Sequence, residues 1–421
     1  MMTIIVSIVV FLILTLFFVS VLLFTKNKLT PSGNVKILVN EDKELETPRG
    51  GNVLSTLQSK GIFLSSACGG GGTCGQCRLQ IFEGGGEILP TETGFFTRKQ
   101  IKDHWRLGCQ TKVNDDLDIF VPEEILGVKE LECEVISNYN VSSFIKELII
   151  KLPDGEHLIF KPGSYIQVNV PKYNIPFTDF NIEARPEEGR KADRFRPEWN
   201  KYKMWELVGR NEEENMRAYS MANYPAEGNI VMLNIRIATP PFDVATKSWK
   251  AGISPGICSS YIFSLKSGDK VKISGPYGEF HILDTKHEML YIGGGAGMAP
   301  LRAQLLHLFH TVKTTDRKIT YWYGARSKNE LFYEEDFRQI EKEFPNFQFN
   351  VALSEPLPED NWKGYTGFIH QVIYDNYLAD HYAPEDIEYY MCGPGPMADA
   401  VKNMLDNLGV PPEMLLFDDF G

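Results

Sequence analysis

The first segment of the chain is almost entirely apolar. From Thr3 to Phe24 it reads TIIVSIVVFLILTLFFVSVLLF, carries no charge, and is followed by Lys26 and Lys28. As a helix it would be about 33 Å long, enough to cross the hydrocarbon core of a bilayer. We therefore predict a transmembrane anchor helix over 3–24 and a polar linker over 25–33. A cleaved signal peptide is the alternative, but its basic n-region, short apolar core and small-residue cleavage site are absent.

The charges around this segment predict its orientation. Lysines follow it and none precedes it, so the positive-inside rule places the bulk of the chain in the cytoplasm. The segment has no ionisable residue that could mark an ion path. We expect it to anchor the chain or to pack against partner helices.

Three further patterns follow the linker. Over 34–128, strand-like runs, a helix opening and a glycine-rich loop predict an α+β domain of the β-grasp type. Over 129–282, short runs of alternating apolar and polar residues separated by Gly and Pro predict an antiparallel β-barrel. Over 283–421, strand-like and helix-like runs alternate, which predicts an α/β domain with a doubly wound parallel sheet.

A charged stretch with scattered aromatic residues interrupts the barrel pattern at about 171–216. It is longer than an ordinary barrel loop. A solvated insertion is the plainer interpretation, and a docking surface for a partner is the alternative.

Composition narrows the class of protein. The 421 residues and 43% hydrophobic content predict several globular domains. A net charge of −12 without a basic block argues against nucleic-acid binding. Seven cysteines, an odd number, argue against a disulfide framework and suit a reducing compartment.

Four of these cysteines form the most specific motif. Cys68, Cys74 and Cys77 lie in a glycine-rich run, and Cys109 follows in Arg-Leu-Gly-Cys. Four thiolates can hold a 2Fe–2S cluster, and small residues let backbone amides approach its sulfides. The C-x5-C-x2-C spacing resembles the ferredoxin pattern, with one residue more than the plant-type C-x4-C-x2-C. Structural zinc is the alternative, although zinc sites usually pair two CxxC knuckles. A cluster transfers one electron at a time, so we predict an electron-transfer protein.

The barrel region carries a candidate flavin site. Arg217-Ala218-Tyr219-Ser220 resembles the Arg-x-Tyr-Ser motif of the ferredoxin–NADP reductase superfamily. An arginine can clamp the flavin diphosphate with paired donors. Tyr219, two residues after Arg217, lies on the same face of the strand and can lie along the isoalloxazine ring or the ribityl chain. Ser220 can hydrogen-bond the flavin near N5.

A second segment of the barrel region supports this prediction. Gly256 precedes a predicted helix start, where Ser259 and Ser260 can cap the helix and free amides can bind phosphate. Each feature alone could be an ordinary turn or cap. In this order they predict FAD binding, and the residues assigned to it here are Gly256, Ile257, Cys258, Ser259 and Ser260.

The nucleotide motif opens the α/β region. A run of small residues follows a strand and opens a helix, with proline in its first turn. It departs from the Gly-x-Gly-x-x-Gly of ordinary dehydrogenases and resembles the nucleotide domain of the ferredoxin–NADP reductase superfamily. Small residues there let a dinucleotide approach the sheet edge. The residues are Gly293, Gly294, Gly295, Ala296, Gly297 and Pro300.

The same resemblance implies further site residues. Cys392, followed by Gly393, would border the nicotinamide, although an ordinary buried cysteine is the alternative. Phe420 would cover the flavin until nicotinamide displaces it, with Asp418 as the acidic residue before it. The predicted catalytic set is Tyr219, Ser220, Cys392, Asp418 and Phe420.

The choice of nicotinamide cofactor depends on two residues. Arg326 follows a strand at a position where it could bind the 2′-phosphate of NADPH. Acidic residues from Glu330 onward would repel a phosphate, so we predict that the chain uses NADH.

The order of all these motifs resembles the electron-input F subunits of bacterial Na⁺-translocating NADH:quinone reductases over essentially the whole chain. The resemblance implies hydride transfer from NADH to FAD, then single electrons passing through the 2Fe–2S cluster to other subunits and eventually to ubiquinone. It also implies a bacterial inner membrane, and sodium export rests on it alone. A soluble oxygenase reductase with the same domains is one alternative, which the anchor argues against. A non-catalytic, zinc-binding tethered protein is another, and it predicts no NADH oxidation.

Overall fold

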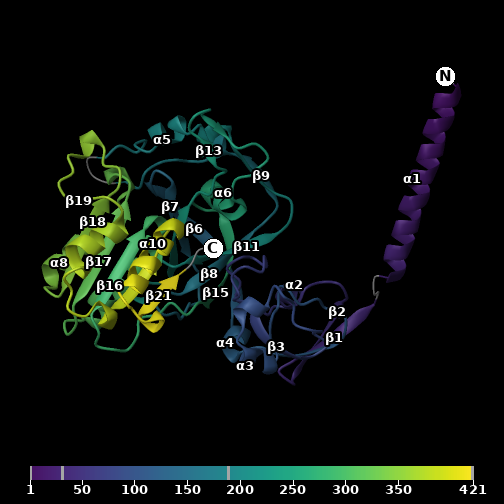
Figure 1. Cartoon of the computed structure of the whole chain (residues 1–421), viewed down its shortest axis with the longest axis horizontal. Helices are drawn as coiled ribbons and strands as arrows, with labels where there is room; N and C mark the ends of the chain where they lie inside the picture. The colour runs from purple at the N-terminus through teal and green to yellow at the C-terminus, as the bar shows by residue number, and fades with distance from the viewer. Residues whose placement is uncertain (1, 30–32, 187–189, 419–421) are drawn as a thin grey trace. The chain divides into compact units, whose positions relative to one another are not determined.

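The computed structural model describes residues 2–29, 33–186 and 190–418 (Figure 1). The chain divides into two compact units, residues 1–65 with 70–127 and residues 66–69 with 128–421. The predicted barrel and nucleotide-binding domains thus belong to one unit, and contacts between them are part of its structure. The predicted domain limits themselves stay predictions.

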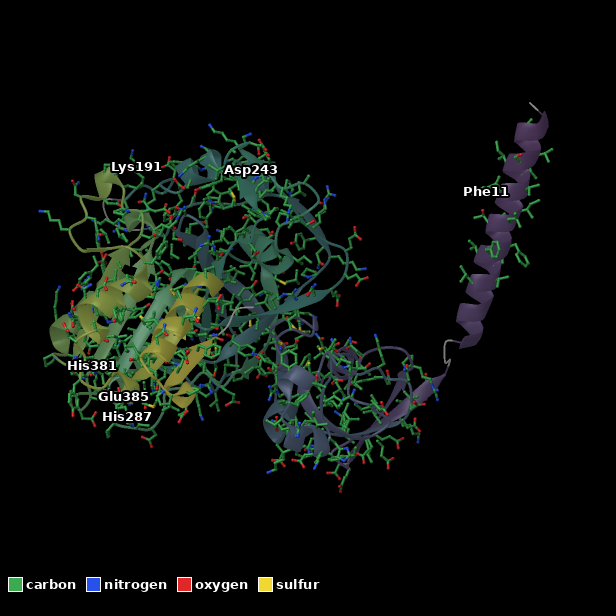
Figure 2. All side chains as sticks on the ribbon, viewed as in Figure 1. Phe11, Lys191, Asp243, His287, His381 and Glu385 are labelled. Carbon is green, nitrogen blue, oxygen red and sulfur yellow. The ribbon has the colours of Figure 1, made fainter. Side chains whose placement is uncertain are left out.

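The N-terminal apolar segment is one continuous helix, α1 (Met2–Leu29). Its window Ile5–Leu22 has a mean hydropathy of 3.1 and is long and apolar enough to cross a membrane by length and composition. No part of that window is buried, and Phe11, for example, projects from the helix with 69% of its surface exposed (Figure 2). Such a surface is unfavourable in water, so the helix suits a lipid or protein-helix environment.

A five-stranded mixed sheet forms the core of the first unit, in the order β2-β1-β5-β3-β4. Val35, Ile37 and Val39 alternate inward along β1, as a half-buried strand requires. Asn52 caps α2 by accepting a hydrogen bond from the Ser55 amide at 2.8 Å. The predicted β-grasp type is confirmed. Its elements are β1 (Asn34–Val39), β2 (Lys43–Pro48), α2 (Val53–Ser59), β3 (Arg78–Glu83), α3 (Arg98–Lys102), β4 (Trp105–Leu107), β5 (Leu117–Phe120) and α4 (Glu123–Leu126).

An antiparallel barrel opens the second unit. Its strand order is β11-β8-β15-β6-β7-β12, and a bridge between Met221 and Leu233 closes it by joining the end of β11 to β12. The predicted barrel is confirmed, with α6 packed against its strands. The elements are β6 (Lys129–Ser142), β7 (Ile145–Lys151), β8 (Tyr165–Val170), β11 (Asn215–Ser220), β12 (Ile230–Arg236), α6 (Ile257–Ser264) and β15 (Lys270–Tyr277).

The charged insertion is more than a solvated loop, contrary to the plainer interpretation. Phe177, Phe180 and Trp199 are buried and join the barrel core, with the two phenylalanine ring centroids 4.5 Å apart. The aromatics are spaced too irregularly to form a period, so only tertiary packing makes them core residues. Within the described part of the insertion the elements are β9 (Tyr173–Pro176), α5 (Arg196–Lys201) and β10 (Val208–Asn211), and a small hairpin beyond it is β13 (Phe242–Asp243) with β14 (Ser248–Trp249).

The rest of the second unit is a parallel sheet in the order β19-β18-β17-β16-β20-β21. Tyr291 of β16 packs with α7 and α8, whereas its neighbours Leu290 and Ile292 pack with α9 and α10, so helices cover both faces (Figure 1). This confirms the doubly wound prediction. The elements are β16 (Met289–Gly294), α7 (Met298–Leu306), β17 (Ile319–Ala325), α8 (Glu334–Glu343), β18 (Phe347–Leu353), β19 (Tyr365–Thr366), α9 (Ile369–Ile373), β20 (Glu388–Cys392), α10 (Gly395–Asn407) and β21 (Leu415–Asp418).

Candidate functional site

Two of the predicted cluster ligands are held together by paired strands. Cys77 immediately precedes β3 and Cys109 follows β4, and both are buried. The Cys109 amide points at the Cys77 sulfur at 3.4 Å. The side-chain hydrogen bond with the Cys109 thiol, then burial, raise the pKa of the Cys77 thiol; the nearby Cys74 adds to the rise, and the hydrogen bond from the Cys109 amide opposes it. Three of the four predicted ligands therefore influence one another, and Cys68 is half-buried in the same loop.

The loop around these cysteines needs glycine for its shape. Gly75 has a φ of +65°, and a Cβ there would lie 2.3 Å from the Phe95 ring. Gly72 has a φ of +77°, and a Cβ there would lie 2.4 Å from Gln110 Nε2. Left-handed glycines turn backbone amides toward an enclosed anion, the arrangement that a cluster's sulfides need. The thiol donors and this loop fit a 2Fe–2S cluster, although within the described residues no three metal-binding side chains are close enough to hold a single ion as they stand.

A buried ion pair beside Cys109 was missed by the sequence reasoning. Glu92 is fully buried, and Arg106 Nη2 donates to it at 2.8 Å. The carboxylate also accepts the Leu107 amide at 2.8 Å, and Arg106 Nη1 donates to the Gly85 carbonyl at 2.7 Å. The pair thus fixes the strand that leads into Cys109. Nothing in the local sequence indicates that these two residues meet.

The flavin motif lies on β11, as predicted. Arg217 donates to Asn215 Oδ1 at 2.9 Å and to the Met216 carbonyl at 2.8 Å, which orients the guanidinium. Burial raises the pKa of Tyr219, the Cys258 thiol adds to this effect, and Arg217 opposes it. Burial likewise raises the pKa of Cys258 to about 11, again opposed by Arg217. The structure therefore brings Arg217, Tyr219 and Cys258 into one electrostatic neighbourhood.

The start of α6 differs from the expectation in one respect. Its N-cap is Gly256, and Ser259 accepts instead from the Ala238 amide at 3.1 Å, so the predicted capping by Ser259 and Ser260 is wrong. The two serines lie inside the first turns, beyond the cap position. A Cβ on Gly256 would lie 2.7 Å from Ala238 Cβ, so glycine permits the close approach. Because the cap has no side-chain acceptor, the first helix amides can serve a phosphate.

The small residues of the nucleotide motif serve packing as well as access. A Cβ on Gly297 would lie 2.0 Å from the Cys392 carbonyl, and one on Gly293 would lie 2.7 Å from the Tyr321 hydroxyl. Glycine there lets α7 approach the sheet. Gly295 has a φ of +57° and is open, with its nearest neighbour 4.0 Å from an added Cβ. Gly295 is therefore the position of the run with open space around it.

A pocket of about 390 Å³ lies at the carboxyl ends of β16, β17, β18 and β20. The chain runs from β16 outward to β19 on one side and then to β20 and β21 on the other, so the pocket lies at the switch point where such folds bind nucleotides. Of the predicted nucleotide residues, Gly294 and Gly295 line it. The sequence reasoning missed the barrel residues Phe144 and Arg236 and the loop residue Phe368, because their approach to the sheet is a tertiary contact.

The pocket contains two arginines in different environments. Arg326 lies 3.5 Å from Glu330 and 3.7 Å from Glu198. Arg236 has no carboxylate within 4.0 Å among the described residues, and burial lowers its pKa, opposed by the more distant Glu330. Arg236 is thus the cation better placed to meet a phosphate from the pocket.

Three predicted catalytic residues meet where the barrel joins the parallel sheet. Ser220 at the end of β11 donates a hydrogen bond to the Asp418 carboxylate at the end of β21. Asp418 is the register partner of the fully buried Cys392 on β20. Of the other two residues in the predicted catalytic set, Tyr219 lies on β11 and Phe420 lies outside the described residues. Ser220, Cys392 and Asp418 therefore form one group.

Family models match three consecutive parts of the chain. A 2Fe-2S iron-sulfur cluster binding domain covers residues 37–114, an oxidoreductase FAD-binding domain covers 199–282, and an oxidoreductase NAD-binding domain covers 291–403. Among solved structures, the fold is similar to an Amycolatopsis cytochrome P450 reductase, GcoB, with TM-score 0.60 and 20% identity over 92% of this chain and 98% of that one. It is also similar to a ferredoxin reductase in carbazole 1,9a-dioxygenase, with TM-score 0.57 and 22% identity over 92% and 99%. The family models and the fold define an iron–sulfur flavoprotein with an NAD-binding domain and a ferredoxin-reductase-like fold.

Full-length relatives define the family within this class. The F subunit of the Na(+)-translocating NADH-quinone reductase of Neisseria meningitidis serogroup C is 52% identical over all of both chains. The F subunits of the same name in Actinobacillus succinogenes and Klebsiella pneumoniae are 53% and 51% identical over 95% and 100% of both chains. This chain belongs to the family of F subunits of the Na(+)-translocating NADH-quinone reductase. The predicted FAD, NAD and 2Fe–2S binding domains are confirmed, and the zinc alternative is not supported.

Proposed function

We propose that this chain is the electron-input subunit of a Na⁺-translocating NADH:ubiquinone reductase. It takes a hydride from NADH onto FAD and passes single electrons through a 2Fe–2S cluster to partner subunits. The observation that carries the proposal is the meeting of Ser220, Asp418 and Cys392 between a flavin-motif strand and a nucleotide-binding sheet. Bound FAD supplies the conversion between two-electron and one-electron transfer, and the cluster transfers electrons singly.

The residues of β11 and α6 would hold the flavin. Arg217 presents a guanidinium already oriented by two acceptors, suited to the diphosphate. The amides at the start of α6 provide a second phosphate contact, next to Gly256. Tyr219 is half-buried beside Cys258 and would lie along the ring or ribityl chain. Hydride transfer needs the nicotinamide and flavin rings in contact, so these residues act by positioning.

Ser220 and Asp418 would act at the reacting end of the site. The serine hydroxyl donates to the carboxylate, which fixes the hydroxyl's orientation and leaves its oxygen lone pairs free to accept. Cys392 is fully buried and lies beside Asp418 in the register of β20 and β21. Phe420 is proposed to cover the flavin until nicotinamide replaces it. NADH would enter by the pocket at Gly294 and Gly295.

Electrons would leave through the cysteine domain. Cys68, Cys74, Cys77 and Cys109 are the proposed cluster ligands, supported by the match to a 2Fe–2S domain and by the left-handed glycines between them. The helix α1 would anchor the chain in the bacterial inner membrane, with the other domains in the cytoplasm, because lysines follow the apolar segment. Quinone would be reached only through partner subunits, and the acidic chain is not expected to bind nucleic acid.

Mild-detergent purification of the tagged full-length chain from its host tests this proposal. We expect about one FAD and two irons per chain, with membrane subunits of a quinone reductase copurifying. Zinc in place of iron would exclude the cluster assignment. The alternative, an oxygenase reductase, shares the fold of the solved structures; it predicts a soluble oxygenase as the copurifying partner and no quinone reduction.

A further inference from the structure

The charged insertion of the barrel domain contacts the nucleotide pocket. Its short helix α5 (Figure 1) carries Glu198, which is half-buried and lies 3.7 Å from Arg326, a residue of the pocket wall. Tyr202 directly follows the helix, and its hydroxyl accepts a hydrogen bond from Arg326 Nη1 at 3.5 Å. On the other side, Glu330 lies 3.5 Å from Arg326 Nη2. One arginine is therefore held by two carboxylates and a hydroxyl.

These groups are themselves fixed by one short loop of the barrel. Trp199, next to Glu198, is fully buried and donates through Nε1 to the Ser143 carbonyl at 2.7 Å. The Ser143 amide donates to Glu330 at 3.2 Å. Phe144, the next residue, packs edge-on against Tyr202, with ring centroids 5.8 Å apart. The insertion, the barrel and the nucleotide domain thus meet at residues 143–144, and both carboxylates are held in place there.

The position of Arg326 gives this contact a consequence for the substrate. Arg326 directly follows β17. In chain order β17 is the second strand of the parallel sheet, after β16, which leads into the nucleotide motif. In dinucleotide-binding folds, an acidic residue at such a place binds the free 2′-hydroxyl of NAD, whereas an available arginine accommodates the 2′-phosphate of NADP. An arginine that is already paired to two carboxylates is not available. A phosphate brought there would also meet the negative charges of those carboxylates.

We propose that Glu198 is a specificity-determining residue for the nicotinamide substrate, because with Glu330 it holds Arg326 in ion pairs that exclude a 2′-phosphate. The inference rests on the proposed oxidation of NADH. It assigns to the insertion at 171–216 a role in building the substrate pocket. Removing the Glu198 charge frees the guanidinium on its insertion side and lowers the repulsion of a phosphate.

The test uses the full-length, FAD-loaded chain in detergent. Calorimetry measures the affinity for 2′,5′-ADP, which carries the 2′-phosphate, against that for 5′-AMP, which does not. Steady-state reduction of ferricyanide measures kcat/KM for NADPH against NADH. In Glu198→Gln we expect the affinity for 2′,5′-ADP and the NADPH/NADH ratio each to rise about tenfold, the size of one charge-assisted hydrogen bond. Glu198→Gln with Glu330→Gln should raise both further.

Two matched variants separate this proposal from general effects. Glu206→Gln removes an exposed carboxylate of the same insertion that forms no ion pair with Arg326, and it should leave both quantities unchanged. Adding Arg326→Leu to Glu198→Gln should abolish the gain. Unchanged 2′,5′-ADP affinity in both Glu198 variants with full FAD content would overturn the proposal, as would an equal gain in Glu206→Gln. A wild-type chain that binds the nucleotides but does not oxidise NADH would instead refute the proposed function.

Discussion

Ser220 donates a hydrogen bond to the carboxylate of Asp418, a residue 198 positions later in the chain. The bond joins the last residue of β11, which carries the flavin motif, to the last residue of β21. In the β20–β21 register Asp418 lies opposite Cys392. One side-chain contact thus connects the flavin strand with the nucleotide sheet at the proposed reaction site.

Removing either partner of this bond should slow hydride transfer. Ser220→Ala deletes the hydroxyl, and Asp418→Asn deletes the charge while keeping the shape, so we expect each to reduce the rate of flavin reduction by NADH about 10²-fold. Stopped-flow absorbance of the full-length chain measures that rate. Glu413→Gln, an exposed carboxylate just before β21, is the control and should retain the wild-type rate. Wild-type rates in both site variants would remove these residues from the reaction.

Loss of one cysteine should separate the two halves of the electron path. Cys74→Ala should abolish the cluster but retain NADH-to-ferricyanide activity, because the flavin lies upstream. Quinone reduction by the assembled complex should stop. Electron paramagnetic resonance of the reduced protein and paired activity assays measure both effects. Unimpaired quinone reduction in this variant would place the cluster outside the route.

The buried Glu92–Arg106 pair should be essential to the cysteine domain. Arg106→Met leaves the Glu92 carboxylate buried without its guanidinium, and breaking a buried pair in this way costs about 3–5 kcal/mol. We expect iron content to fall while FAD content and NADH-to-ferricyanide activity remain. Metal analysis and flavin absorbance of the purified chain measure this. Arg98→Met, at an exposed arginine of α3, is the control; equal iron loss there would contradict the special role of the pair.

The buried Lys146 should make the stability of the barrel depend on pH. Burial lowers its pKa from 10.5 to about 7, opposed only in part by Glu183, although its ammonium donates to the carbonyls of Asn138 and Asn181 at 2.7 and 2.8 Å. Between those two values the unfolded chain binds a proton that the folded chain lacks, so folding stability rises with pH. The slope from this residue is about 1.4 kcal/mol per pH unit, and no further change arises below pH 7.

Lys146→Met should remove that slope. Urea unfolding of the FAD-saturated chain, followed by tryptophan fluorescence between about pH 6.5 and 10, measures the free energy of unfolding of both proteins. Lys250→Met, at an exposed lysine of the same barrel domain, should keep the wild-type slope. Identical slopes in the wild type and Lys146→Met would show that the buried amine keeps its ordinary pKa.

Local sequence patterns predicted the elements and motifs whose functional groups are close together along the chain. The uncharged run at 3–24 predicted a helix because nearly every one of its positions is apolar. The Cys74–Cys77 spacing, the Arg217–Ser220 motif and the glycine run at 293–297 each place their groups within one loop or strand, so a few residues were enough to indicate them. The alternation of strands and helices after residue 283 similarly predicted a parallel sheet.

Only the tertiary structure decided which distant residues meet. Ser220 with Asp418, Glu92 with Arg106, and Glu198 with Arg326 are contacts between residues whose local sequences carry no sign of each other. The aromatic residues of the insertion became core because the barrel offers a face to bury them, which no periodicity indicated. Burial and charge pairing depend on how elements pack. The sequence by itself therefore determined the elements and their cofactor chemistry, and the packing decided the walls of the pocket and the partners of its charges.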